Sequence, residues 1–283
     1  MTDDSFRIGT MTRADVDIAI EWAAAEGWNP GDDDARCFHA ADGEGFLMGR
    51  LGLLPIATIS VVRYGAGFGF LGLYIVRPEY RGRGYGMRLW NAGLAHLAGR
   101  NVGLDGVVAQ QDNYRKSGFT LAYRNIRYAG TGGARGGVDH RIVPLSAVPF
   151  AETLGYDHAC FPDERTAFLR AWLAQPRARA LGILHAGRLA GYGVVRPARN
   201  GFKVGPLFAD DPELADALLD GLAACVPDGT PLFLDVPEIN MAAVALALQR
   251  GMTVGFETAR MYTGPAPALP LRRIFGVTTF ELG

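Results

Sequence analysis

The fold of this chain is decided by Leu71-Gly-Leu-Tyr-Ile-Val-Arg-Pro-Glu-Tyr-Arg-Gly-Arg-Gly-Tyr-Gly86. Residues 71–76 are an apolar run typical of a buried strand, and residues 81–86 form a glycine-rich turn before a helix that we expect to begin near Met87. A turn of this kind directs successive backbone N–H groups toward an anion at the positive end of the helix. The stretch therefore predicts a cradle for phosphate groups.

The turn offers both space and charge to an anion. Gly82, Gly84 and Gly86 carry no Cβ that would keep a ligand away, and Arg81 and Arg83 are positive. No Gly-Lys-Ser/Thr follows, which excludes a P-loop, and the glycine spacing is not that of the dinucleotide fingerprint Gly-x-Gly-x-x-Gly.

Arg81, Gly84 and Gly86 fit the pattern Arg/Gln-x-x-Gly-x-Gly/Ala, through which the chain resembles the GNAT superfamily of N-acetyltransferases. Downstream, Tyr114-Arg-Lys-Ser-Gly-Phe119 matches the Tyr-x-x-x-Gly-Phe element of the same family. Two motifs in this order are far more specific than one. Family members often carry an Asn seven residues before that tyrosine, where this chain has Val107, so we expect a short or irregular helix before Tyr114.

The resemblance implies how a cofactor would bind. In the family the glycine loop holds the pyrophosphate of acetyl-CoA, and the strand before it splays from its neighbour so that backbone amides bind the pantetheine arm and the thioester carbonyl. The implied cofactor-binding residues are Tyr74, Ile75, Val76, Arg81, Gly82, Arg83, Gly84, Tyr85 and Gly86. Tyr114 would protonate the departing thiolate, because a phenol keeps its proton at neutral pH. The alternative for Tyr114 is a half-buried aromatic packed beside Phe119.

Candidates for the acceptor side follow the first predicted helix, in the region that forms an acceptor wall in the resembled family. Trp28 and Asn29 lie in Glu26-Gly-Trp-Asn-Pro30, and Trp28 is either an aromatic wall or a core anchor. Asp33, in a run of three aspartates, could attract a cationic amine or belong to a solvated loop and helix cap. Tyr64, at the end of a strand beside the cradle strand, is a further candidate or a turn residue.

The second part of the chain repeats the first at a shift of 133 residues. The aligned pairs are Val61-Val62-Arg63 with Val194-Val195-Arg196, Gly72 with Gly205, Gly118-Phe119 with Gly251-Met252, and Arg127 with Arg260. The repeat lacks the functional motifs, because Leu-Ala-Asp-Ala-Leu-Leu at 214–219 replaces the glycine turn and Ala247 replaces Tyr114. It keeps an Asn at position 240, seven residues before Ala247. We expect a second module that has kept the fold and lost the cofactor.

The predicted fold class is α/β (α+β), with two tandem GNAT-like modules, each a mixed, mostly antiparallel sheet flanked by helices. Residues 1–129 are expected to form the catalytic domain that binds acetyl-CoA, and residues 130–137 a Gly-rich linker. Residues 138–283 are expected to form a degenerate domain that lines the acceptor site. The run 273–281 looks like an added strand.

Local signals place the elements of each module. Thr12 and Asp15 predict a capping box for a helix to about Ala25, and Asp211-Pro212 predicts the start of another helix. Strands are expected at 46–50, 56–63, 68–76, 178–185, 189–196 and 202–209.

Composition excludes several classes of protein. The net charge of −1 and the pI near 6.5 offer no field that gathers nucleic acid. The three cysteines are far apart and the five histidines show no ligand spacing, so neither a disulfide framework nor a metal site is expected. Without a signal segment or an apolar run of membrane-spanning length, we expect no membrane contact and place the protein in the cytoplasm.

The expected activity is transfer of an acetyl group from acetyl-CoA, as cosubstrate, to a primary amine of a small-molecule acceptor by direct attack in a ternary complex. The alternative is a non-catalytic acyl-CoA sensor. Aminoacyl transfer from charged tRNA is disfavoured. Duplicated GNAT-like proteins with that activity have a basic face for tRNA and lack an intact CoA cradle, and this chain shows the opposite on both counts. The acceptor, the general base and the oligomeric state cannot be read from the sequence.

Overall fold

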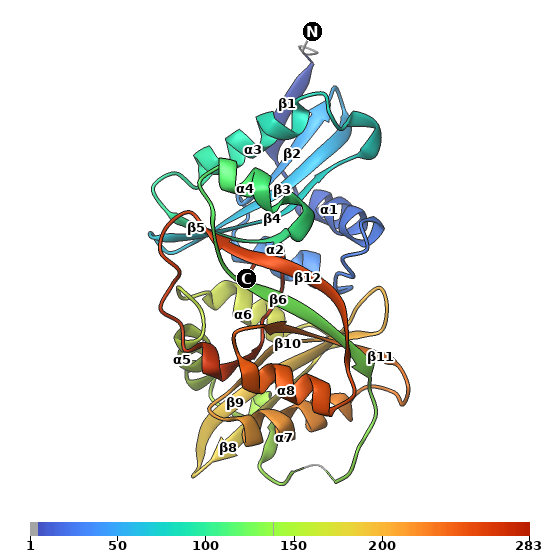
Figure 1. Cartoon of the computed structure of the whole chain (residues 1–283), viewed down its shortest axis with the longest axis vertical. Coiled ribbons are helices and arrows are strands. Elements are labelled where there is room, and N and C mark those ends of the chain that lie inside the picture. The colour runs from blue at the N-terminus through green and yellow to red at the C-terminus, as the bar shows by residue number, and fades with distance from the viewer. Residues whose placement is uncertain (1–4, 138) are drawn as a thin grey trace.

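The computed structural model describes residues 5–137 and 139–283. The first half contributes β1 (Phe6–Thr10), α1 (Arg13–Ala25), α2 (Asp34–Ala41), β2 (Phe46–Leu51), β3 (Leu54–Tyr64), β4 (Phe68–Val76), α3 (Tyr85–His96), β5 (Asn101–Val107), α4 (Gln111–Lys116) and β6 (Thr120–Thr131). The second half contributes β7 (Ile142–Pro144), α5 (Phe150–Ala159), α6 (Thr166–Leu173), β8 (Arg179–His185), β9 (Arg188–Pro197), β10 (Phe202–Ala209), α7 (Pro212–Ala223), β11 (Pro231–Pro237), α8 (Met241–Gln249), β12 (Thr253–Tyr262) and β13 (Ile274–Gly276). The two halves follow one another along the long axis of the molecule (Figure 1).

The strands of the described residues form one 13-stranded sheet. Their order is β1-β2-β3-β4-β5-β12-β6-β11-β10-β9-β8-β7, and β13 pairs with β10. Strand β12 comes from the second half but pairs with β5, and β6 comes from the first half but pairs with β11. The halves have therefore exchanged the strands β6 and β12, which lie side by side across the middle of the molecule (Figure 1).

The predicted fold class is confirmed, since each half is a mixed, mostly antiparallel sheet flanked by helices. The parallel pairs are β4 with β5 and β10 with β11, one in each half. The joining of the two sheets was not predicted from the sequence. Because Thr131 in β6 pairs with Pro231, the Gly-rich stretch begins as strand. The division of the chain at residues 129 and 137 stays a prediction.

Helix starts agree with their local signals. The Thr12 side chain accepts from the backbone N–H of Asp15 while the Asp15 carboxylate accepts from the backbone N–H of Thr12, which is the predicted capping box of α1. Asp211 is the N-cap of α7, where its side chain accepts from the backbone N–H of Leu214 at 2.9 Å. The predicted strands all exist, with bounds that differ by two residues or fewer.

The predicted strand at 273–281 is wrong in extent. Strand pairing there is confined to β13, and residues 277–283 continue as a buried, turning segment. A hydrogen bond from the N–H of Leu282 to the hydroxyl of Thr279, 2.9 Å long, closes that turn. Apolar residues in a short run therefore indicated burial here, and not strand.

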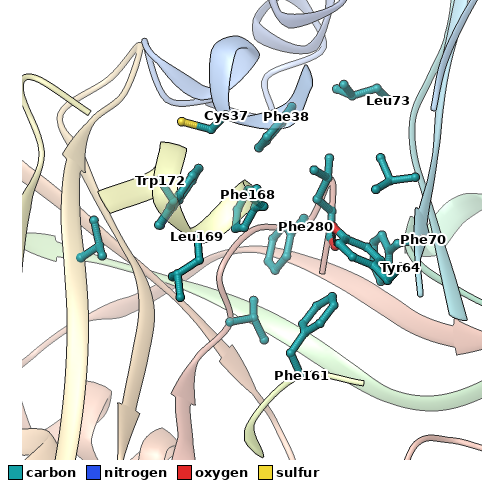
Figure 2. Close-up of a cluster of buried hydrophobic side chains, with 14 of the residues drawn as sticks. Cys37, Phe38, Tyr64, Phe70, Leu73, Phe161, Phe168, Leu169, Trp172 and Phe280 are labelled. Carbon is teal, nitrogen blue, oxygen red and sulfur yellow. Dashed lines mark hydrogen bonds between the residues drawn. The ribbon is translucent and has the colours of Figure 1, made fainter. Parts of the chain in front are cut away.

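The largest hydrophobic cluster lies between the halves. Figure 2 shows Phe38 and Phe70 of the first half in one group with Phe168 and Trp172 of the second. Two further clusters lie beneath α3 and beneath α7 and α8. Because the central cluster is shared, neither half has its whole core to itself.

Two buried ion pairs secure the exchanged strands. Arg127 in β6 donates to Asp235 in β11 at 2.7 and 2.8 Å, and Arg260 in β12 donates to Asp105 in β5 at 2.8 and 2.6 Å. Arg127 and Arg260 are aligned by the sequence repeat, and the two aspartates occupy the same position of equivalent strands. The repeat is thus visible as a pseudo-symmetric pair of contacts. Burial raises the pKa of Asp105, whereas at Asp235 the nearby Arg127 and Lys203 overcome burial and hold the pKa low.

Candidate active site

The predicted cradle lies between β4 and α3. Gly82 and Gly84 have φ values of +74° and +84°, which L side chains rarely adopt, and both are exposed. A Cβ added to either glycine meets nothing within 4 Å, so the backbone is open on that side. Gly84 is the N-cap of α3, which begins at Tyr85 rather than near Met87. The turn therefore presents free backbone at the start of a helix, as a phosphate cradle requires.

Gly86 has a different role from the one we expected. A Cβ on Gly86 would lie 2.6 Å from the hydroxyl of Tyr74 and 3.0 Å from a methyl of Val76. The missing side chain therefore lets the first turn of α3 pack against β4, and it does not clear space for a ligand.

The arginines of the cradle are partly engaged. The Nε of Arg81 donates to the carbonyl of Val76 at 2.7 Å, and its guanidinium also pairs with Glu26. Arg81 thus fastens the turn to the end of β4. Arg83 is exposed and lies 5.6 Å from the ring centre of Tyr80, which leaves its charge at the rim of the cradle. The ring of Tyr85 is buried against Phe6, 4.9 Å between centres, so Tyr85 offers the cradle its backbone and not its phenol.

Strands β4 and β5 diverge beside the cradle, and the diverging part of this strand pair is here called the slot. The parallel pairing begins at Phe68 with Asn101 and stops at Leu71 with Leu104, and beyond these residues the two strands diverge. Opposite Ile59 of β3, β4 bulges by one residue, with Leu73 at φ +45°. The predicted cofactor residues 74–76 all lie on the diverging part of β4.

Aromatic rings line the slot on the side of α3 and α4. The ring of Tyr114 lies over Gly106 of β5, where any Cβ would overlap it, and stacks on Trp90 at 5.7 Å. The ring of Tyr74 also contacts Trp90, with 5.2 Å between the ring centres. Trp90 was not among the predicted site residues, although it stands four residues after Gly86 and so lies on the same face of α3. Its Nε1 donates to Ser117 at 3.0 Å, which ties α3 to the second motif.

The Tyr114 phenol keeps its proton over a wide pH range. Burial, assisted by the neighbouring Tyr74, raises the pKa of Tyr114 to about 12. Among residues 5–137 and 139–283, none forms a hydrogen bond with its hydroxyl. Helix α4 around it is short, at six residues, as the missing Asn at position 107 predicted.

Trp28 and Asn29 lie at the junction of the two halves. Trp28 is half-buried against the central cluster, and its carbonyl accepts from Arg127 at 2.8 Å. Asn29 has φ +53° and forms two hydrogen bonds with the backbone of Asn200, 3.0 and 2.8 Å long. These contacts bind the loop after α1 to the turn between β9 and β10.

Asp33 and Tyr64 are engaged by other parts of the chain. Arg177 pairs with Asp33 at 3.4 Å and with the adjacent Asp32 at 2.9 Å. Asp33 is therefore no free anion for an ammonium group. Tyr64 is buried at 3% exposure and donates its hydroxyl to the carbonyl of Leu282 at 3.1 Å, so it is neither a turn residue nor open to solvent.

Comparisons with known proteins agree with this geometry. Residues 12–119 match the sequence model of the acetyltransferase (GNAT) family, and residues 153–276 match that of an acetyltransferase (GNAT) domain. The chain is 31% identical over 266 residues to a holothin acyltransferase of a Pseudoalteromonas strain, covering 94% of this chain and 90% of the relative. The chain belongs to the GNAT family. It is an acyltransferase.

Solved GNAT structures share its tandem fold. A candidate acetyltransferase from Pyrococcus horikoshii is 22% identical, with a TM-score of 0.84 over 99% of this chain and 96% of its own. A tandem GNAT protein from the clavulanic acid biosynthesis pathway is 16% identical, with a TM-score of 0.64 over 92% of this chain and 99% of its own.

The second GNAT unit has no counterpart of the cradle in its described residues. Residues 214–219, aligned with the glycine turn, lie within α7, and Leu214, Ala215, Leu218 and Leu219 are buried in its core. Ala247, aligned with Tyr114, is likewise buried. Within the described residues, no group of three or more His, Cys, Asp or Glu side chains could hold a metal ion, and no helix has the length and apolarity needed to span a membrane.

Proposed function

We propose that this GNAT protein transfers an acetyl group from acetyl-CoA to the primary amine of a small-molecule acceptor. The observation that carries the proposal is the placing of the cradle and Tyr114 around one slot. The cradle follows the open end of β4, and Tyr114 covers Gly106 on the facing strand β5. Acetyl-CoA binds through its pyrophosphate and reacts at a thioester at the other end of the molecule. It therefore needs a phosphate cradle at one end of its binding site and an acid at the other.

The open backbone at Gly82 and Gly84, with the charge of Arg83, fits a pyrophosphate. The diverging part of β4 fits an extended pantetheine arm, which Tyr74 and Trp90 would flank. Acetyl-CoA supplies the activated thioester. Preorganised backbone amides at the bulge of β4 would stabilise the oxyanion that forms during acyl transfer.

Tyr114 is the proposed general acid. The acceptor amine attacks the thioester carbonyl, a C–N bond forms and the C–S bond breaks, and the phenol of Tyr114 gives its proton to the departing thiolate. The ammonium that forms on the acceptor loses its proton to solvent, which restores the phenol through water. Direct attack needs both substrates bound at once, so we expect ternary-complex kinetics and no acetylated enzyme.

The name of the Pseudoalteromonas relative supports a small-molecule acceptor for this chain as well. That name specifies acyl transfer but does not give the length of the acyl group. The acetyl donor therefore rests on the geometry of the slot and on the descriptions of the two matching family models.

Thermal unfolding with and without acetyl-CoA, followed by thiol release on a panel of amines, tests the proposal. Ligand at about 100 times its dissociation constant should stabilise the protein by about 2.7 kcal/mol. Thiol release that depends on an amine would support the transferase. A stabilising shift without release on any amine would favour the acyl-CoA sensor, and no shift would overturn the cofactor site.

A further inference from the structure

The second half has a slot equivalent to that between β4 and β5, and the chain itself fills it. Strands β10 and β11 pair in parallel from Phe202 with Leu232 to Val204 with Leu234, and then diverge. Beyond that point β13 pairs with β10, and the N–H of Val277 donates to the carbonyl of Asp235 in β11 at 2.8 Å. Strand β13 thus lies as a wedge between the two diverging strands.

Asn240 clamps this wedge. Its amide nitrogen donates to the carbonyls of Leu271 and Ile274 at 3.1 and 3.0 Å, while its oxygen caps α8. A Cβ at Gly276 would lie 2.6 Å from a methyl of Leu234, so the wedge fits because glycine stands there. In the first half the aligned position is Val107, which has no such side-chain amide.

From the wedge, residues 277–283, here called the strap, run to the slot of the first half. The strap passes two glycines that the sequence repeat aligns. These are Gly205 at the bulge of β10 and Gly72 at the bulge of β4. A Cβ on Gly205 would overlap the carbonyl of Thr278, and a Cβ on Gly72 would overlap the carbonyl of Glu281. The strap therefore touches both bulges through its backbone.

The strap is held from both halves. Arg165 donates to the hydroxyl of Thr278 at 2.8 Å, and Tyr64 donates to the carbonyl of Leu282. The ring of Phe280 lies 4.8 Å from the guanidinium of Arg127. Figure 2 shows Phe280 among aromatic side chains of both halves. All strap residues are buried.

We propose that the strap is the acceptor-side wall of the catalytic slot, and that the second half is built to hold it there. The inference rests on the proposed function. Gly72 directly follows Leu71, the last residue of β4 paired with β5, so Glu281 lies against β4 where the slot opens. Tyr114 covers the face of α3 and α4, and the strap covers the opposite face. In this position the strap allows the acceptor amine to reach the bound thioester and shields the thioester from water.

This role makes Tyr64 and Gly72 positioning residues of the acceptor site. Neither contacts the cradle, but each determines where the strap lies. Gly72→Ala places a methyl group into the Glu281 carbonyl and should displace the strap. Tyr64→Phe removes one hydrogen bond to the strap and leaves the ring in place.

The test uses acetyl-CoA alone, with thiol release in the absence of any amine as the main readout. Displacing the strap admits water, which attacks the thioester to give acetate and free CoA. We expect Gly72→Ala to raise this hydrolysis roughly tenfold at unchanged acetyl-CoA affinity, and Tyr64→Phe to raise it less. Gly9→Ala, in β1 of the same sheet and with open space around its Cβ, is the matched control and should behave as the wild type.

Wild-type hydrolysis rates in both variants would overturn the strap proposal. If Gly72→Ala does not fold, Tyr64→Phe decides alone, with Tyr128→Phe in β6 as its control. A wild type that binds no acetyl-CoA would overturn the proposed function instead, so the two failures are distinguishable. With any amine that is turned over, displacement of the strap should also raise the acceptor KM more than it lowers kcat.

Discussion

At the scale of single residues, the proposed chemistry depends on one phenol. Tyr114 lies over Gly106 and against Trp90, and burial raises its pKa to about 12. A general acid must carry its proton in order to act, and a raised pKa extends the pH range in which the phenol is protonated. We therefore expect the rate to show no loss of this acid between pH 7 and about pH 10.

Tyr114→Phe should lower kcat roughly 10²-fold while acetyl-CoA affinity changes little, because the ring still packs on Trp90 but the proton is gone. Steady-state kinetics and titration with acetyl-CoA measure the two effects. Tyr74→Phe is the matched control, since Tyr74 meets the same tryptophan but its hydroxyl packs at Gly86. A wild-type rate in Tyr114→Phe, or an equal loss in both variants, would refute the assignment.

The predicted cradle could be judged from the sequence because its residues are consecutive and their conformation is local. Gly82 and Gly84 have positive φ values, which glycine adopts without strain. Asp33 could not be judged in the same way, because its partner Arg177 lies 144 residues away in the chain. Tyr64 has its partner, Leu282, 218 residues away. The residues that neighbour Asp33 or Tyr64 in the sequence do not indicate contacts with partners so far away in the chain.

At the scale of elements, the exchanged strands are the main feature. Strands β6 and β12 lie next to each other, and each carries a buried arginine paired with an aspartate of the other half. Their hydrogen bonds join segments more than a hundred residues apart, which no local signal predicts. The sequence repeat aligned Arg127 with Arg260 but did not indicate that the strands carrying them are exchanged between the halves.

Arg260→Ala should lower the free energy of unfolding by about 3–5 kcal/mol, because it removes the only cation paired with the buried Asp105 among the described residues and leaves it a single neutral donor, the amide of Asn125. Denaturant unfolding measures this cost. Arg124→Ala is the control, since Arg124 of β6 bonds the half-exposed Glu257 of the same strand β12 and should cost less than about 1 kcal/mol. Equal midpoints for the two variants would show that the buried pair does not secure the exchange.

At the scale of the whole molecule, the halves share one sheet and one central cluster. A protease site introduced at the exposed Gly136 and Gly137 should be cleaved without separating the fragments, because β6 stays paired with β11 and β12. Size-exclusion chromatography after cleavage should give one peak at the mass of the intact chain. Two separately folded fragments would contradict the exchange.

The tandem fold could be predicted from the repeat and from two motifs, and the helix caps and strands from local patterns. The joining of the sheets and the path of residues 277–283 could not, because both depend on contacts between distant parts of the chain. Residues 273–281 illustrate the limit: their sequence predicted an added strand, and the structure divides most of them between the short wedge β13 at one slot and a strap leading to the other.

Calorimetric titration with acetyl-CoA decides whether one half or both halves bind the cofactor, because its stoichiometry counts the binding sites in each chain. We predict one site per chain, lost in Gly84→Val and kept in Gly99→Val. Both glycines have φ above +80° and nothing within 4 Å of an added Cβ, but Gly99 lies outside the cradle. Two sites per chain, no site, or equal binding by both variants would contradict the account.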